Sequence, residues 1–237
     1  MSTLSSADLP TAESPVLVHE QRDATGALFF RSSTKDGALH GLVESFGPGE
    51  KLISQGNYHN GLLQGLMQNF DADGNLLREA NYHQGKPDGV TRVFANGKLL
   101  LEQWFVNGIA HGETCSYSEA GLVVSRVNFR VGKIEGEAHF FNEGILLRKS
   151  SYRNGLLEGD TIDYDRDQRV FQSATYQKNL LHGMLRRYHP NGELMEEAKY
   201  VKGKLQGKLR RFRSNGVEEG AAEDLGVMQR LEKMIKG

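Results

Sequence analysis

The chain has 237 residues, of which 28 are glycine and 5 are proline, and its single cysteine is Cys115. Glycine at about 12% exceeds the usual share of roughly 7%, but a collagen-like chain would need far more glycine and abundant proline. The 29 basic and 30 acidic residues give a formal net charge of −1, which argues against a general nucleic-acid-binding protein. One cysteine excludes an intramolecular disulfide and a cysteine-based zinc site.

The first fifteen residues are rich in Ser, Thr, Ala and Pro, so we expect residues 1–15 to form a mobile N-terminal segment. They contain neither the basic n-region nor the apolar h-region of a signal peptide. No apolar run in the chain reaches the roughly 18 residues that a membrane span needs. We therefore expect a cytoplasmic protein that does not insert into a membrane.

Residues 16–216 form one repeat array with a period of 23–24 residues, which is the signature of a repeat architecture. A G-x-x-x-G pair recurs in eight units, with Asn in place of the first glycine in one of them. An aromatic residue stands three positions before this first residue in most units, and another stands five positions after the second glycine. The pairs are Gly37/Gly41, Gly61/Gly65, Gly85/Gly89, Gly108/Gly112, Gly132/Gly136, Gly155/Gly159, Asn179/Gly183 and Gly203/Gly207.

A third glycine marks the other end of each unit and often follows Asp or Asn, as in Asp73-Gly74 and Asn96-Gly97, with Gln168 in its place once. Asn-Gly and Asp-Gly between apolar runs indicate hairpin turns, because both residues tolerate a positive φ. Each unit therefore predicts a strand, a G-x-x-x-G loop, a second strand and a tight turn.

Alternation along the strands assigns residues to the two faces of the sheet. In residues 76–82, one face is predicted to carry Leu76, Ala80 and Tyr82, and the opposite face Leu77, Glu79 and Asn81. The fold class that follows is all-β: an elongated, single-layer antiparallel sheet of about eight stacked β-hairpin repeats.

The pattern changes after residue 216. Four apolar residues recur there at helical spacing: Leu225, Met228, Leu231 and Ile235. We predict a short C-terminal capping helix within residues 217–237 that covers the open end of the sheet, because an open edge invites aggregation. A helix that binds a partner is the alternative.

The repeat unit resembles the MORN repeat in its bacterial variant form, on the residues Tyr82, Gly85, Gly89, Phe94, Gly97 and Leu99 and their equivalents over residues 26–216. The resemblance implies an elongated antiparallel sheet of stacked hairpins. Bacterial variants are often classed as antitoxins or immunity proteins that neutralise a partner toxin. Eukaryotic relatives tether membranes or scaffold protein assemblies.

The sequence contains no constellation that indicates catalysis. Five of the eight histidines occupy recurrent repeat positions, and no H-E-x-x-H or similar metal spacing occurs. Cys115 and His139 lie one repeat apart, but no third member of a triad accompanies them. We therefore expect no enzymatic activity, no metal and no cofactor.

A binding surface is the better-supported prediction. The column three residues after each second glycine is varied, which suits an irregular partner or, equally, neutral drift on a solvated face. Three apolar residues also stand where other units are polar. The predicted partner-binding residues are Trp104, Val106, Phe140, Arg92, His139, Arg186 and Arg210. The alternative is that another part of the protein packs over them.

The leading hypothesis is a non-catalytic immunity protein or antitoxin that binds a cognate toxin or secreted effector, encoded by a neighbouring gene. Its competitor is a scaffold or membrane-associated repeat protein that binds anionic lipid or other proteins through its basic C-terminal end. Residues 182–213 there hold nine basic and three acidic residues. No specific nucleic acid is expected, whereas a homo-oligomer, the binding face and the identity of the toxin stay open.

Overall fold

The computed structural model describes residues 14–219, and these residues are all-β apart from one 3-10 turn, η1 (Pro48–Glu50). Contacts divide them into two units. Unit 1 contains residues 14–98 and Phe105–Gly108, and unit 2 contains Leu99–Trp104 and residues 109–219. Within residues 14–219 no helix has the length and apolar character needed to cross a membrane.

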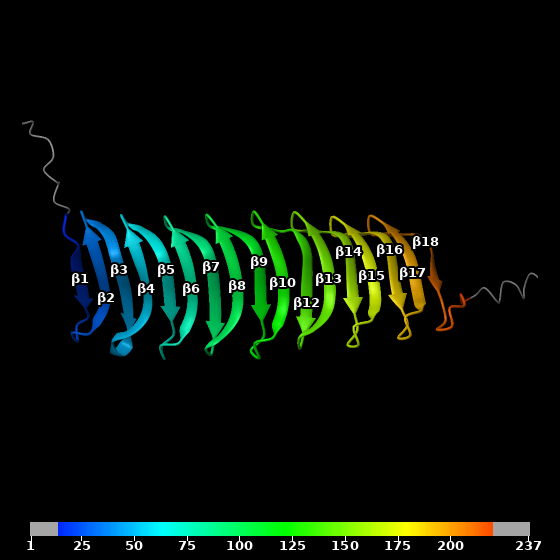
Figure 1. Cartoon of the computed structure of the whole chain (residues 1–237), viewed down its shortest axis with the longest axis horizontal. Helices are drawn as coiled ribbons and strands as arrows, with labels where there is room; N and C mark the ends of the chain where they lie inside the picture. Colours follow the sequence, from blue (N-terminus) through cyan, green and yellow to red (C-terminus); the bar gives the residue numbers. More distant parts are fainter. Residues whose placement is uncertain (1–13, 220–237) are drawn as a thin grey trace, which may run out of the picture. The chain divides into compact units, whose positions relative to one another are not determined.

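Unit 1 is an antiparallel sheet in which each strand pairs with the next one along the chain (Figure 1). Its strands are β1 (Leu17–Arg22), β2 (Leu28–Lys35), β3 (Ala38–Gly47), β4 (Lys51–His59), β5 (Leu62–Phe70), β6 (Leu76–His83) and β7 (Lys86–Ala95). The next strand, β8 (Lys98–Val106), has its ends in unit 1 and its centre in unit 2.

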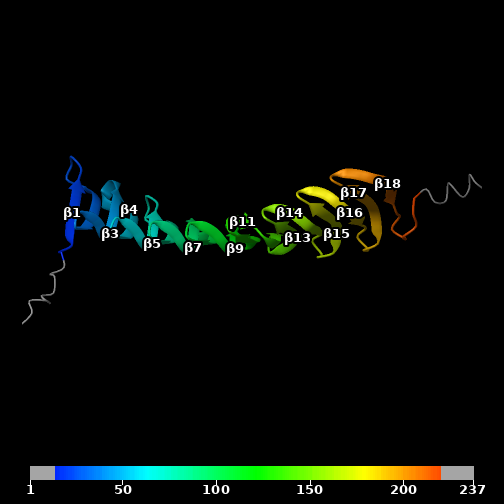
Figure 2. The same ribbon diagram turned by 90° about the horizontal axis from the view of Figure 1, so that it is seen from above.

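Unit 2 continues the same pattern of antiparallel neighbours. Its strands are β9 (Ile109–Tyr117), β10 (Val123–Arg130), β11 (Lys133–Ile134), β12 (Gly136–Asn142), β13 (Ile145–Arg153), β14 (Leu156–Tyr164), β15 (Val170–Gln177), β16 (Leu180–Tyr188), β17 (Leu194–Val201) and β18 (Lys204–Arg211). Viewed from above, each unit is a single layer of described strands (Figure 2). The predicted all-β, single-layer sheet of antiparallel hairpins is confirmed.

The first glycine of each pair lies in a tight turn rather than in a loop. Asn60 and Gly61 form the whole connection between β4 and β5, with φ of 49° and 81°. Two successive positive φ values are the geometry of a type I′ hairpin turn, which matches the twist of the strands. The predicted G-x-x-x-G loop is therefore wrong, because the strand resumes directly after this turn and contains the second glycine.

Adjacent turns are also hydrogen-bonded to one another along this edge of each unit. The backbone N–H of Gly61 donates to the carbonyl of Leu39 at 2.8 Å, and that of Gly85 donates to Leu63 at 2.9 Å. In unit 2, Gly155 donates to Ile134 at 2.8 Å. Each turn thus satisfies a carbonyl of the preceding hairpin, which couples one repeat to the next.

One turn contains a residue that does not suit its backbone. Val131 has a φ of 50°, where three of the equivalent turn positions hold Asn60, Asn107 and Asn154 at 49°, 49° and 52°. A β-branched residue is strained in this left-handed region, whereas Asn adopts it readily. Val131 is also 66% exposed, so its side chain makes little packing contribution that would offset the strain.

We expect Val131→Asn to stabilise the protein by about 1 kcal/mol, because it relieves this strain without removing a buried contact. Urea denaturation should show a higher midpoint with an unchanged slope. Asn154→Val, in the turn of the next hairpin, is the matched control and should lower the midpoint. Equal midpoints for Val131→Asn and the wild type would show that the turn carries no strain.

The second glycine of each pair lies inside a strand, at a bulge where one residue faces three across the ladder. In the pairing of β13 with β14, Ser150 faces Thr161 and Tyr152 faces Leu157, so that Ser151 alone spans three residues around Gly159. Gly159 has a φ of 106°, and a Cβ there would lie 3.1 Å from the Cβ of Ser151. Positive φ and close approach both require glycine at this place.

A second bulge lies beside the turns at the other edge of the sheet, where an aromatic residue pairs with an aliphatic one, as Phe70 does with Leu76. It changes the face of the sheet to which nearby side chains belong. In the pairing of β14 with β15, Asp163 faces Gln172 and Tyr164 faces Val170, so Phe171 is the extra residue. Phe171 lines a hollow together with Ser150 and Tyr176, whereas Val170 lines one with Ile162 and Ser173 on the other side.

Leu77 is the extra residue at the same bulge in β6, between the pairs Phe70–Leu76 and Asn69–Arg78. Placing Leu77 opposite to Ala80 and Tyr82 was therefore wrong, since strict alternation does not hold across a bulge. The residue at the Leu77 position, which is Leu147 or Phe171 around the hollow, shares a face with the tyrosine of its strand. We call this face of each unit the alanine face, defined by Ala80 in unit 1 and by Ala138, Ala174 and Ala198 in unit 2, and the other the opposite face.

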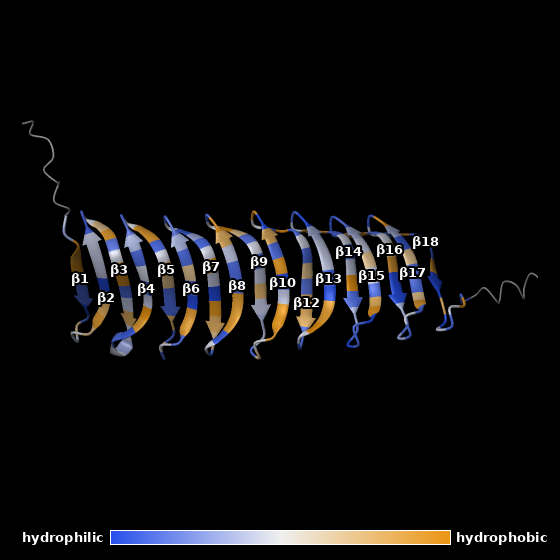
Figure 3. Ribbon diagram, viewed as in Figure 1, coloured by the Kyte–Doolittle hydropathy of each residue, from blue (hydrophilic) through white to orange (hydrophobic). Residues whose placement is uncertain are grey.

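The core of each unit is a strip of small side chains. Ala80, Ala138, Ala174 and Ala198 are 0–3% exposed, and none of the described large side chains is fully buried. Apolar segments recur near the same ends of successive strands, beside the turns (Figure 3). Because a single layer buries little apolar area, the hydrogen-bonded ladders and cross-strand pairs carry much of the stability.

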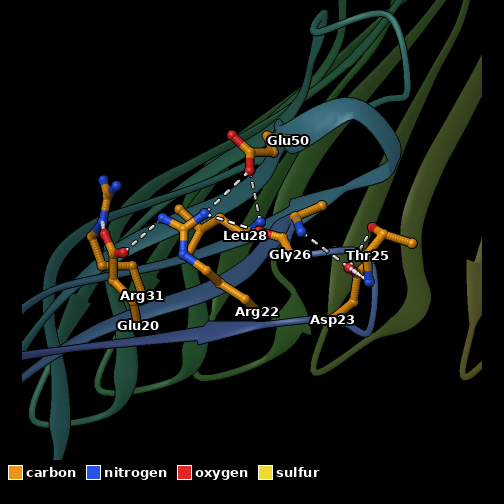
Figure 4. Close-up of polar contacts among 9 residues, drawn as sticks. Glu20, Arg22, Asp23, Thr25, Gly26, Leu28, Arg31 and Glu50 are labelled. Atoms are coloured by element: carbon orange, nitrogen blue, oxygen red, sulfur yellow. Dashed lines mark hydrogen bonds and ion pairs between the residues drawn. The ribbon is translucent and has the colours of Figure 1, made fainter.

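The N-terminal edge of unit 1 is held by a charged cluster. Arg22 lies 2.9 Å from Glu20 and 3.6 Å from Glu50, and it donates to the carbonyl of Gly26 at 3.1 Å (Figure 4). Arg31 joins Glu20 to Glu44 at 3.1 Å on each side. These pairs tie β1 to β2 and β3, and the Arg22 and Arg31 hydrogen bonds lower the pKa of Glu20.

The predicted N-terminal segment and C-terminal helix lie largely outside the described residues. Of the helix segment 217–237, only residues 217–219 are described, and they continue the sheet. Phe212 forms a bridge with Glu218, and the backbone N–H of Glu219 donates to Arg211 at 2.8 Å. These three residues therefore run antiparallel beside the end of β18.

Candidate binding surface

The varied column of the sequence forms part of a polar ladder on the opposite face. Arg92 faces Glu79 across the ladder and lies 3.0 Å from it. In unit 2, Glu197 lies between Arg186 and Arg210, at 3.5 and 2.7 Å. The variety of the column thus has a structural reason at these positions, because the three arginines complement glutamates on adjacent strands.

A second polar ladder crosses the alanine face of unit 2, from β13 to β18. Its members in order are Arg148, Asp163, Gln172, Arg187, Glu196 and Arg211, joined by contacts of 2.5, 3.1, 3.0, 3.3 and 3.4 Å. Hydrogen bonding to Asp163 raises the pKa of Arg148. Consecutive side chains are therefore linked over six strands.

The two signs of charge in this ladder lie at different depths. The side chains of Arg148, Arg187 and Arg211 are 52%, 46% and 63% exposed, whereas those of Asp163 and Glu196 are 6% and 14% exposed. The carboxylates are covered and the guanidinium groups face solvent. This part of the alanine face therefore presents positive charge to a partner, even though its charges nearly balance.

Beside Arg148 the alanine face is hollowed. The hollow has a volume of about 490 Å³, and its wall consists of Phe140, Leu147, Tyr152, Leu157, Tyr164, Phe171 and Tyr176. Ser150, Thr161 and Asp163, which are 2%, 6% and 4% exposed, form its polar floor. The Thr161 hydroxyl donates to Ser150 Oγ at 3.2 Å.

The hollow arises from a local change in the repeat. Thr161 stands two residues after its glycine, where the next hairpin has Leu185, which is 9% exposed. Ser150 likewise stands in the column of Ala174 and Ala198. A threonine and a serine at the base of aromatic walls leave both space and hydrogen-bonding groups. Apolar walls with a few convergent polar groups are typical of binding sites.

The structure separates the predicted binding residues. Phe140 lines the hollow on the alanine face, whereas its neighbour His139 points to the opposite face. Arg92, Arg186 and Arg210 lie on the opposite face, in the ladder described above. Phe140 is therefore the one residue of the predicted set that the described hollow contains.

Trp104 also lies on the opposite face of unit 2. Trp104 takes the position that Ser151 has in a later unit, since a Cβ on Gly112 would be 3.6 Å from the Trp104 Cβ and one on Gly159 would be 3.1 Å from the Ser151 Cβ. Ser151 lies between Ser150 and Tyr152 in its strand and so points to the opposite face. Trp104 is 47% exposed and Val106, at the end of β8, is 48% exposed. Trp104 and Phe140 thus face opposite sides and do not form one contact patch.

The structure does not bring Cys115 and His139 together, because Arg126 on β10 pairs with both of them. The Cys115 thiol is buried and donates to Glu113 at 3.3 Å, and burial raises its pKa. A reactive cysteine would need the opposite shift. Among residues 14–219, no group of three or more His, Cys, Asp or Glu side chains is placed to hold a metal ion.

Sequence reasoning missed most residues of the hollow. Leu147 and Phe171 occupy the repeat position of Leu77, which strict alternation placed on the wrong face. Ser150 and Thr161 carried a partial signal, because the following unit has Ala174 and Leu185 at the two positions. Asp163 was one more polar member of a polar column, so its burial could not be read from the chain.

The described residues define an antiparallel β-repeat protein built from hairpin units. The family model for the MORN repeat variant matches two of these units, at residues 63–84 and 181–202. Repeats of this family are typically protein- or lipid-binding, which is consistent with a non-catalytic binding protein.

No curated protein matches the chain. Among solved structures, a mutant of S. aureus TarM in complex with Fondaparinux, α-GlcNAc-glycerol and UDP is 13% identical, with a TM-score of 0.30 over 40% of this chain and 19% of that one. A TcdB2-TccC3-Cdc42 structure is 12% identical, with a TM-score of 0.20 over 85% of this chain and 13% of that one. The chain thus spans less than a fifth of either structure, and neither likeness bears on its function.

Proposed function

We propose that this protein is a non-catalytic binding protein that holds a partner polypeptide on the alanine face of unit 2. The observation that carries the proposal is the aromatic hollow with its polar floor, formed where the next unit has Ala174 and Leu185 in place of Ser150 and Thr161. Exposed aromatic side chains around a pocket are the usual anchors of protein interfaces. The buried, high-pKa thiol of Cys115 gives no support to a nucleophilic enzyme.

The finer form of the proposal is that the partner is a cognate bacterial toxin or secreted effector and that this protein neutralises it as an antitoxin. It rests on the resemblance of the repeats, since fold alone does not define a function. Co-expression with the product of the adjacent reading frame tests it. A co-purified complex and restored growth are expected, and the absence of both would refute the antitoxin role.

The alternative is a scaffold that binds anionic lipid through residues 182–213. Four arginines of this region, Arg186, Arg187, Arg210 and Arg211, already contact Glu196 or Glu197, which reduces the charge available to a lipid surface. Sedimentation with phosphatidylserine vesicles over a salt series discriminates, because electrostatic lipid binding weakens as salt rises. We expect little co-sedimentation at physiological salt.

A further inference from the structure

We propose that the hollow on the alanine face takes a tyrosine side chain of an acidic, extended partner segment, with a neighbouring carboxylate bound by Arg148. This inference rests on the proposed function and names the chemistry of its partner. Three features of the hollow carry it: its aromatic wall, its hydroxyl floor and the outward-facing guanidinium group beside it.

The wall selects a flat apolar side chain. Phe140, Tyr152, Phe171 and Tyr176 surround the hollow, and aromatic rings contact one another favourably in offset or edge-to-face arrangements. Its volume of about 490 Å³ accepts a large side chain together with part of its backbone. An aliphatic side chain would bury less area and make no ring contact.

The floor selects a side chain that ends in a hydrogen-bonding group. Ser150 and Thr161 are 2% and 6% exposed, and their hydroxyls contact each other at 3.2 Å. A hydroxyl can both donate and accept, so each keeps capacity for a further bond. Tyrosine satisfies this capacity, whereas phenylalanine covers the two hydroxyls without bonding them, which costs affinity.

The charge of the surface selects an acidic segment. Arg148 donates through Nε to Asp163 at 2.5 Å and is 52% exposed, so its outer N–H groups face solvent at the rim of the hollow. Arg187 and Arg211 continue the positive row on the same face, while the carboxylates that pair with them are covered. A carboxylate next to the tyrosine completes the complementarity.

The test is an NMR titration of the ¹⁵N-labelled full chain with the peptide acetyl-Gly-Tyr-Glu-Gly-amide. We expect saturable shifts confined to β12–β15. Replacing the peptide's tyrosine by phenylalanine should weaken binding about fivefold, the effect of one lost hydrogen bond. Replacing its glutamate by glutamine should weaken binding about threefold, as for an exposed charge pair. No saturable shift with the parent peptide would overturn the proposal.

Thr161→Leu is the decisive variant, because leucine already occupies the equivalent position of the next hairpin as Leu185 and should fill the hollow. We expect it to abolish binding, while Thr114→Leu, in the same column two hairpins earlier, should bind like the wild type. Equal binding by Thr161→Leu and wild type contradicts the site. Arg148→Gln keeps the hollow and should remove the preference for glutamate over glutamine; an unchanged preference contradicts the role of Arg148.

The same variants separate this inference from the proposed function. If the neighbouring gene product still binds Thr161→Leu as it binds the wild type, the hollow is not its site, although the protein remains a binding protein. If the peptide occupies the hollow but no complex forms with that gene product, the hollow stands and the antitoxin role fails. If Thr161→Leu, but not Thr114→Leu, fails to bind both the peptide and the neighbouring gene product, the result supports the inference and the proposed function together.

Discussion

Gly183→Ala should destabilise unit 2 by about 2–5 kcal/mol, because it combines a strained backbone with a steric clash. Gly183 has a φ of 135°, a conformation that residues with a side chain rarely adopt. A Cβ there would lie 2.8 Å from the Cβ of Thr175 and 3.2 and 3.3 Å from its Oγ1 and Cγ2. Thr175 is part of the neighbouring strand, so the clash cannot be relieved by a simple rotamer change. Urea denaturation or hydrogen exchange of β15 and β16 measures the loss.

Two further variants separate the clash from the backbone strain. Gly121→Ala changes a turn glycine with a φ of 78° and nothing within 4 Å, so it should cost only about 1–2 kcal/mol. Thr175→Gly removes all three clashing atoms and should recover part of the loss when combined with Gly183→Ala, measured against Thr175→Gly alone. Equal costs for Gly183→Ala and Gly121→Ala would show that β15 yields at this place and that the close approach is not rigid.

The sequence determined the fold class because its strongest signals are local and repeated. A phased glycine at a position of positive φ, such as Gly61 or Gly159, predicts a turn or bulge without knowledge of the partner strand. What the glycines do there was harder to predict. Gly61 and Gly65 lie four residues apart and suggest a loop, yet one belongs to a two-residue turn and the other to a strand.

The candidate site was less predictable because it depends on register. A bulge moves Phe171 to the face of Tyr176, and no pattern within one strand reveals an extra residue opposite its neighbour. The partnership of Arg186 with Glu197 likewise joins two strands. A repeat column joins equivalent positions that lie two strands apart, such as Arg186 and Arg210. It therefore does not show that Arg186 faces Glu197 on the adjacent strand.

Breaking the ion pair at the hollow should reveal which of its two charges is buried. We expect Arg148→Met to destabilise unit 2 by about 2–4 kcal/mol, and Asp163→Asn by roughly half as much. The Asp163 side chain is only 6% exposed, so removal of Arg148 leaves a covered carboxylate that still accepts a hydrogen bond from Gln172 at 3.1 Å. Arg148 is 52% exposed and can be hydrated after Asp163 is replaced. Thermal or urea denaturation of the two variants measures both losses of unfolding free energy and therefore their ratio.

The matched control is Arg211→Met at the far end of the same ladder. Arg211 is 63% exposed and lies 3.4 Å from Glu196, which also keeps its contact with Arg187 at 3.3 Å. Its loss should cost at most about 1 kcal/mol, the range for exposed pairs. A loss in Arg211→Met as large as that in Arg148→Met would mean that lost packing of the arginine, rather than the stranded Asp163 carboxylate, causes the destabilisation.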